Sequence, residues 1–254
     1  MTNVVANRHA GRLAIVTGAG SGLGKATAER LAAEGARVAC VDIALASATS
    51  TADGIGDAAK ALQCDVSDPA SVTACVEHAV AWLGNINLAV TCAGIGTLAH
   101  SHELEFAEWK RILDVNLTGT FLIAQAAVKQ MLVGGGGRIV TIASNAGLMG
   151  QPFSAAYCAS KGGVVNLTRA LADEYIKRGI TVNCVAPGGI DTPLQGAFAQ
   201  SLPEGTSWKD MRKSMTPLGN SQPEEVASVV AFIASDEARY MTGSIVSIDG
   251  GLTL

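Results

Sequence analysis

Short apolar runs rich in β-branched residues recur along the chain, and they constrain its fold more than any other feature. The clear runs span 12–18, 36–42, 86–92, 138–144, 180–187 and 244–249, and a weaker one spans 60–66. These runs are continuously apolar rather than alternating, as is typical of strands that helices cover on both faces. The composition agrees, because 48% of the 254 residues are hydrophobic and only 16% are charged.

Helical patterns separate these runs, for example at 23–35 and 69–84. The second pattern has Asp68 placed as an N-cap, Pro69 at its first position and Gly84 just past its end. Strand and helix patterns alternate from one end to the other without a linker, a repeat or a break in composition. We therefore expect a single doubly wound α/β domain over 1–254, with a seven-stranded parallel sheet and helices on both faces.

Charge and composition argue against several classes of protein. There are 18 basic and 22 acidic residues, a net charge of −4, with no basic stripe, so we expect no nucleic-acid partner. The opening "MTNVVANRHAG" lacks the apolar core of a signal peptide, and no apolar run approaches the ~20 residues that span a bilayer. We expect a cytoplasmic protein without membrane contact. The six cysteines and four histidines show no metal-ligand spacing, so we expect no metal.

A glycine-rich turn, "TGAGSGLG" at 17–24, closes the first predicted strand and opens the first predicted helix. Gly18, Gly22 and Gly24 allow a tight turn and a close approach of a ligand, while the helix directs its first N–H groups at a phosphate. Such a turn is a weak signal alone. It becomes a strong prediction of dinucleotide binding because the second predicted strand ends in Asp42.

Asp42 also indicates which dinucleotide is bound. Its carboxylate is expected to accept hydrogen bonds from the adenosine ribose. A 2′-phosphate there would meet this charge at about 5 Å, which costs roughly 3 kcal/mol at an effective dielectric constant near 20. The next residue, Ile43, brings no cation to offset that repulsion. We therefore expect NAD to be preferred over NADP.

Tyr157 and Lys161 are four residues apart, so on a helix their side chains share one face. Taken alone, that spacing is most often incidental. A phenol with a pKa near 10 becomes useful near pH 7 to 8 only after a downward shift of two to three units, about 3–4 kcal/mol, which a nearby ammonium and a nicotinium ring can supply. Ser144, at the end of a predicted strand, can donate a hydrogen bond to a substrate oxygen.

With these residues assembled, the chain resembles the short-chain dehydrogenase/reductase family in its compact single-domain branch, over essentially its whole length. The family pattern T-G-x-x-x-G-x-G matches 17–24, and its active-site asparagine matches Asn116 in "VNLTG". Its serine matches Ser144, and its Y-x-x-x-K pair matches Tyr157 and Lys161. The usual N-N-A-G after the fourth strand is replaced by "TCAG" at 91–94, which retains the Ala-Gly half.

The resemblance implies a Rossmann fold and a set of site residues. Asn116, Ser144, Tyr157 and Lys161 would form a proton relay, in which Asn116 holds a water that links Lys161 to solvent. The residues implied to contact NAD are Gly18, Ser21, Gly22, Leu23, Gly24, Asp42, Ile43, Asp65, Val66, Cys92, Ala93, Gly94, Tyr157, Lys161, Pro187, Gly188, Ile190 and Thr192. The reaction expected of such a site is reversible hydride transfer between a secondary alcohol and a ketone.

The stretch 192–222 follows a predicted strand, carries no strand pattern and has few apolar residues. It is either a surface connection or a substrate lid, and its length favours a lid. Its apolar residues indicate an apolar alcohol or ketone as substrate, although they could also be the lid's own core; they are Leu194, Phe198, Trp208, Met211 and Met215. The expected pocket is formed by Ser144, Met149, Phe153, Tyr157, Gly188, Leu194 and Phe198.

Two other functions remain open. The pattern is also similar to 3-oxoacyl-carrier-protein reductases, but Asp42 favours NAD, and Asp173 and Glu174 lie where a basic surface for an acidic carrier is expected. A catalytically silent NAD(H)-binding sensor is the second alternative, disfavoured because Tyr157 and Lys161 are both retained. The resemblance further implies a homotetramer built through helices at 117–133 and 155–178.

Overall fold

The computed structural model describes residues 3–254, except for the side chains of Trp208 and Lys213, so the predicted role of Trp208 lies outside the described residues. Seven parallel strands form one sheet in the order β3-β2-β1-β4-β5-β6-β7. Their bounds are β1 Leu13–Thr17, β2 Arg37–Asp42, β3 Ala59–Gln63, β4 Leu88–Thr91, β5 Gly137–Ile142, β6 Ile180–Pro187 and β7 Ile245–Ile248. The predicted seven-stranded parallel sheet is confirmed.

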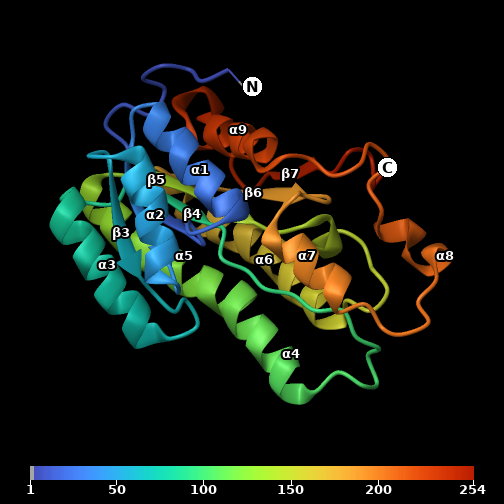
Figure 1. Cartoon of the computed structure of the whole chain (residues 1–254). Coiled ribbons are helices and arrows are strands. Elements are labelled where there is room, and N and C mark those ends of the chain that lie inside the picture. The colour runs from blue at the N-terminus through green and yellow to red at the C-terminus, as the bar shows by residue number, and fades with distance from the viewer. Residues whose placement is uncertain (1–2) are drawn as a thin grey trace.

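Helices lie on both faces of this sheet (Figure 1). Their bounds are α1 Gly22–Ala33, α2 Leu45–Ile55, α3 Pro69–Leu83, α4 Phe106–Leu113, α5 Gly119–Gly134, α6 Ala155–Tyr175, α7 Pro193–Gln200, α8 Trp208–Met211 and α9 Pro223–Ala234. Alternate residues of the strands supply two separate cores. Ile15 packs with residues of α3 and α5, whereas Ala14 and Val16 pack with residues of α1 and α9. This double coverage explains the continuously apolar runs.

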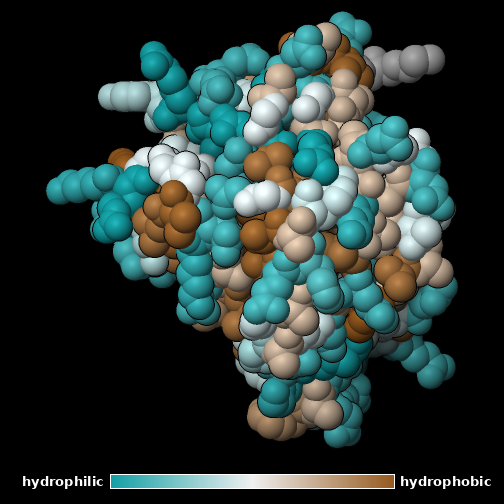
Figure 2. Space-filling view, turned by 90° about the vertical axis from the view of Figure 1, so that its left-hand side faces the viewer, coloured by the Kyte–Doolittle hydropathy of each residue, from teal (hydrophilic) through white to brown (hydrophobic). Residues whose placement is uncertain are grey.

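The weakest predicted strand, β3, lies at one edge of the sheet. Only Leu62 of its five residues is buried, so its sequence is less apolar than that of the central strands. Figure 2 views the molecule from the side on which β3, α2 and α3 lie, and hydrophilic residues cover much of that face. An edge position therefore accounts for the weak pattern at 60–66.

The helix ends predicted for 69–84 are confirmed in atomic detail. The Asp68 carboxylate accepts hydrogen bonds from the backbone N–H of Ala70 at 3.0 Å and of Ser71 at 3.3 Å. Gly84 follows the last residue of α3 with φ of +90°, a conformation that favours glycine. Local capping chemistry thus fixes where α3 begins and ends.

The carboxyl ends of the parallel strands lie together at one end of the sheet. There β1 has β2 on one side and β4 on the other, so the strand order reverses. Such a reversal of strand order opens a crevice for ligands. Helices α7 and α8 come from the stretch 192–222 that follows β6. Its ends are held together because Asp191 N–H donates to Ser221 O and Ser221 N–H donates to Gly189 O, each at 2.9 Å. Among the described residues, no helix is long and apolar enough to span a membrane.

Candidate active site

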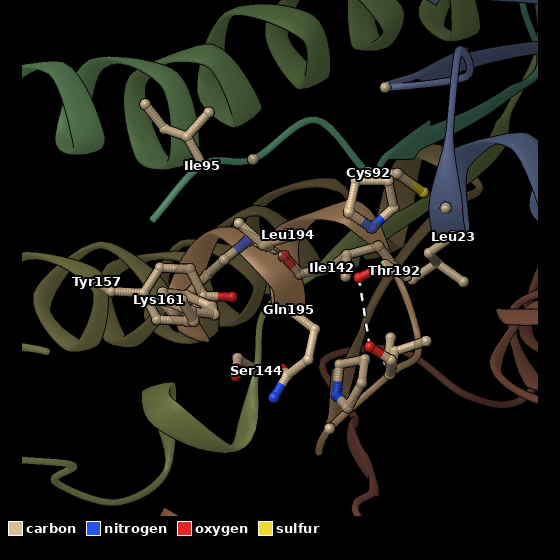
Figure 3. Close-up of a pocket in the computed structure, with 18 of the residues that line it drawn as sticks. Leu23, Cys92, Ile95, Ile142, Ser144, Tyr157, Lys161, Thr192, Leu194 and Gln195 are labelled. Atoms are coloured by element: carbon tan, nitrogen blue, oxygen red, sulfur yellow. Dashed lines mark hydrogen bonds between the residues drawn. The ribbon is translucent and has the colours of Figure 1, made fainter. Parts of the chain in front are cut away.

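A cavity of about 800 Å³ lies between the carboxyl ends of the strands and α7 (Figure 3). Every residue that the resemblance assigned to NAD lines it, from the glycine turn after β1 to Thr192 before α7. Ser144 lines the same cavity, so the nucleotide end and the expected reactive end are continuous. A site of this size suits a dinucleotide with a small substrate beside it.

The glycine turn leaves no room for side chains. A Cβ atom on Gly18, where φ is +67°, would lie 2.9 Å from the backbone nitrogen of Ala93, and one on Gly24 would collide with the carbonyl oxygen of Gly18. Ser21, the N-cap residue of α1, makes no side-chain capping hydrogen bond. The first N–H groups of this 12-residue helix therefore remain available at the cavity, a fit for the pyrophosphate of a dinucleotide.

Two carboxylates on the nucleotide side are held by their own loops. Asp42 Oδ2 accepts a hydrogen bond from Gly20 N–H and Oδ1 from Ala44 N–H, both at 2.9 Å. Asp65 Oδ1 accepts from the backbone N–H and the hydroxyl of Ser67 at 2.9 and 2.6 Å. Each oxygen has two acceptor positions, so these bonds orient Asp42 and leave acceptor capacity for ribose hydroxyls.

Tyr157 and Lys161, both on α6, are almost completely buried, as is Ser144 after β5. Lys161 Nζ donates to the carbonyl oxygen of Ile142 at 2.9 Å and lies 5.8 Å from the centre of the Tyr157 ring. Burial raises the pKa of Tyr157 to about 12, against the opposing effect of a hydrogen bond with Ser144. Burial also lowers the pKa of Lys161 to about 8. Burial thus favours the neutral forms of both groups, and the downward shift of the tyrosine pKa that the ammonium and a nicotinium ring can supply stays a prediction.

Asn116 makes its side-chain hydrogen bonds within the protein. It is fully buried in the π-helical turn Asp114–Thr118 and does not line the cavity. Its Nδ2 donates to Ile95 O at 2.9 Å and to Ser160 Oγ at 3.0 Å, and its Oδ1 accepts from Ile95 N–H at 2.8 Å. Both amide hydrogens are thus used within the protein. Asn116 joins the loop after β4 to α6, and its predicted role of holding a water beside Lys161 stays a prediction.

The substrate end agrees with part of the predicted pocket. Gly188, Leu194 and Phe198 line it together with Ser144 and Tyr157, and so do Met211 and Met215. Met149 and Phe153 do not line it, which corrects the prediction. Phe153 has φ of +62° and packs edge-on against His100, with ring centroids 5.0 Å apart, beside a separate smaller hollow. The loop after Ser144 turns at Phe153, a conformation that no spacing rule revealed.

Several lining residues at this end were not predicted. They are Ile95, Gln151, Ser154, Gln195 and Leu202. Figure 3 shows the Gln195 side chain pointing from α7 toward Ser144. All five lie in loops or in the stretch 192–222, where the sequence has no periodicity that tells which side faces a cavity. Across the described residues, no group of three or more histidine, cysteine or acidic side chains could hold a metal ion.

Comparison with known proteins places the chain in a family. A family model described as enoyl-(acyl carrier protein) reductase matches residues 18–253. D-threitol dehydrogenase of Mycolicibacterium smegmatis is 41% identical over 96% of this chain and 94% of its own length. Cyclohexanol dehydrogenase of an Acinetobacter species is 41% identical over 100% of this chain and 99% of its own. The chain belongs to the short-chain dehydrogenase/reductase family and is an oxidoreductase.

A solved structure shows the same fold around a nicotinamide cofactor. The 3-ketoacyl-(acyl-carrier-protein) reductase of Brucella melitensis, crystallised with NADH, superposes with a TM-score of 0.89 at 34% identity. The match covers 97% of this chain and all of that one. The relatives thus include enzymes named for small alcohols and one named for a carrier-bound ketone.

Proposed function

We propose that the protein is an NAD-dependent oxidoreductase that interconverts a secondary alcohol and its ketone. The observation that supports this most strongly is that Ser144, Tyr157 and Lys161 line the same cavity as the glycine turn and Asp42. A buried phenol, a buried amine and a hydroxyl are thereby present where a substrate would adjoin the cofactor. Dehydrogenases named for threitol and cyclohexanol, each 41% identical to this chain, support an alcohol substrate.

NAD rather than NADP suits the charges that line the nucleotide side. Asp42 presents a fixed carboxylate there. Arg111 and Lys161 are the cations among the described lining residues. Arg111 already donates to both oxygens of Glu108 at 2.8 Å, and Lys161 is bound to Ile142. Since Arg111 is already paired with Glu108 and Lys161 lies beside Tyr157, the repulsion between Asp42 and a 2′-phosphate would remain uncompensated.

Each reactive residue then has a distinct task. NAD⁺, when bound, supplies the acceptor for the hydride that leaves the carbinol carbon. The Ser144 hydroxyl donates a hydrogen bond to the substrate oxygen and orients it. Tyr157 accepts the hydroxyl proton during oxidation and returns it during reduction, while Lys161 supports the tyrosinate and binds the nicotinamide ribose. Asn116 positions the loop of Ile95, and its side-chain oxygen retains acceptor capacity for the water of the proposed proton path.

The carrier-protein reductase remains the second candidate, because a relative of that kind shares the fold with a TM-score of 0.89. Asp173 and Glu174 are exposed on α6 and oppose an acidic carrier. A silent sensor would not need the Tyr157, Lys161 and Ser144 arrangement.

We also propose a cytoplasmic location and a homotetramer that pairs segments of 117–133 and 155–178. Light scattering after gel filtration tests the assembly, and a monomer would contradict it.

The activity is tested by NADH formation from NAD⁺ with a panel of alcohols. The panel runs from cyclohexanol and polyols through hydroxyacyl thioesters to steroids, with Tyr157→Phe as the blank and NADP⁺ as the alternative cofactor. We expect turnover of one alcohol class with NAD⁺, abolished in the variant. Turnover of hydroxyacyl thioesters alone would favour the carrier-protein reductase. Tight NADH binding without any turnover would favour the sensor.

A further inference from the structure

One aromatic side chain forms the wall of the cavity beside the Tyr157 ring. Phe198 of α7 meets that ring nearly edge to face, with centroids 5.1 Å apart and planes at 79°. No residue of α7 is buried, so this helix has no core of its own to hold it in place. The contact between the two rings is therefore an important part of what positions α7 over the site.

The ring of Phe198 fits there because residue 96 is glycine. A Cβ atom on Gly96 would lie 2.5 Å from both Cε1 and Cζ of Phe198, and 3.0 Å from Cδ2 of Tyr157. Real Cβ atoms do not approach other atoms as closely as 2.5 Å. The ring of Phe198 thus occupies the space that any side chain at position 96 would need.

A second contact joins the same two segments. The backbone N–H of Leu98 donates to Ser201 Oγ at 3.0 Å, and that hydroxyl donates to the carbonyl oxygen of Phe198 at 3.2 Å. Gly96 and Leu98 belong to the loop after β4, whereas Phe198 and Ser201 lie in and just after α7. The hydrogen bonds therefore fix the end of α7 close to the glycine that accommodates the ring.

We propose that Phe198 and Gly96 form a paired size filter for the substrate, an inference that rests on the proposed alcohol and ketone activity. The ring edge closes the space next to the phenol that exchanges the proton. The groups attached to the reacting carbon must then be compact, as in a small ring or a short chain. Secondary alcohols with a bulky group next to that carbon are excluded at this wall.

Substitution of Phe198 tests the filter directly. In Phe198→Ala, we expect kcat/KM for 2-phenylcyclohexanol relative to cyclohexanol to rise at least tenfold over the wild type. Leu218→Ala is the matched control, because Leu218 is another apolar residue of the stretch 192–222 but is 85% exposed and is not among the residues that line the cavity. The control should change this ratio less than twofold. An unchanged ratio in Phe198→Ala, or an equal rise in the control, would overturn the proposal.

The pairing with Gly96 predicts a rescue. Gly96→Ala should lower kcat/KM for cyclohexanol at least tenfold, because the new methyl group displaces Phe198. The double variant Gly96→Ala, Phe198→Ala should recover part of that loss, since the smaller side chain at 198 leaves room for the methyl group. A double variant no better than Gly96→Ala would show that the two residues do not act as a pair. Melting temperatures of all variants show whether each one is folded.

Hydrogen exchange of the full chain tests the contact without turnover. Gly96→Ala should speed amide exchange in 193–200 at least tenfold, while exchange in α1 stays unchanged. Unchanged exchange in α7 would overturn the proposal, even if the wild type is an active alcohol dehydrogenase. If the wild type oxidises no alcohol but exchange still accelerates, the proposed function fails while the Phe198–Gly96 contact stands.

Discussion

Two clusters of largely buried polar and ionisable side chains lie at opposite ends of the parallel strands. The amino-edge cluster comprises Arg8, His9, Arg30 and Glu34, where the chain before β1 passes α1 and α9 (Figure 1). The cavity cluster comprises Ser144, Tyr157 and Lys161 at the carboxyl edge. Both clusters are largely withdrawn from solvent, and the second lines the cavity of about 800 Å³.

The two clusters differ in how their charges are neutralised. Glu34 accepts a hydrogen bond from Arg30 Nε at 2.6 Å, and its second oxygen lies 3.6 Å from both Arg8 and His9. Tyr157 and Lys161 have no ion-pair partner among the described residues, and burial shifts both pKa values toward the neutral forms. Burial alone therefore does not mark a functional site. An ionisable group without an ion-pair partner, facing a cavity, is the informative combination.

The largest effect should follow from Lys161→Met. The substitution removes the one amine in the cavity cluster but keeps a long side chain, so kcat/KM should fall about 10²- to 10⁴-fold. Stability should hold or rise, because a buried amine with a single hydrogen bond is replaced by an apolar group. Steady-state kinetics and urea unfolding measure the two effects. A variant that is strongly destabilised but still active would place Lys161 with the structural cluster instead.

Only the rate of oxidation, and not that of reduction, should increase steeply with pH. Oxidation needs the deprotonated form of Tyr157, whose pKa burial raises to about 12, so the oxidation rate should increase from pH 7 to 9. Reduction uses the protonated phenol, which dominates over that whole range, and its rate should not increase. The two rates are measured separately with saturating cofactor. An oxidation rate that is flat from pH 6 to 9 would contradict proton transfer to a tyrosine whose pKa is raised in this way.

Glu34→Ala should lower stability and leave activity unchanged, which is the opposite of Lys161→Met. It removes the fully buried carboxylate that both Arg30 and Arg8 contact, which costs about 3–5 kcal/mol of unfolding free energy. Activity per folded molecule should not change. Glu237→Ala is the control, because Glu237 also pairs with Arg8, at 3.1 Å, but its side chain is 57% exposed. The control should lose at most about 1 kcal/mol. Equal losses in both variants would contradict the assignment of Glu34 as the buried anchor.

The smallest effect concerns His9. Burial lowers its pKa despite the nearby Glu34, and Arg12 and Arg8 lower it further. The folded state therefore binds this proton less readily than the unfolded state. The resulting stability is present above the unfolded pKa near 6.5 and is lost as the pH falls below it. Unfolding at pH 7.5 and 5.5 should show a smaller loss in His9→Gln than in the wild type. The same loss in both proteins would contradict this role.

Of the two clusters, only the cavity cluster could be predicted from the sequence. The glycine turn, Asp42, Ser144, Tyr157 and Lys161 follow strand ends or a helix register, and parallel strands bring such positions to one edge. The seven strands could also be predicted, because a sheet that helices cover on both faces requires continuous apolar runs. Local patterns are sufficient where a side chain's direction follows from regular structure.

Other features depend on contacts between distant segments. The left-handed turn at Phe153 and the inward position of Gln195 occur where no periodicity applies. The double use of the Asn116 amide depends on where the loop of Ile95 lies. The amino-edge cluster was not predicted, because His9 and Glu34 meet only after the chain folds. Spacing rules do not reveal such encounters.

The most direct test compares Tyr157→Phe and Glu34→Ala in the same two assays, turnover per folded molecule and free energy of unfolding. We expect opposite results. Tyr157→Phe should lose nearly all turnover and keep its stability, whereas Glu34→Ala should keep its turnover and lose stability. If Tyr157→Phe retains turnover close to that of the wild type, the cavity cluster does not carry the reaction and the proposed function is wrong.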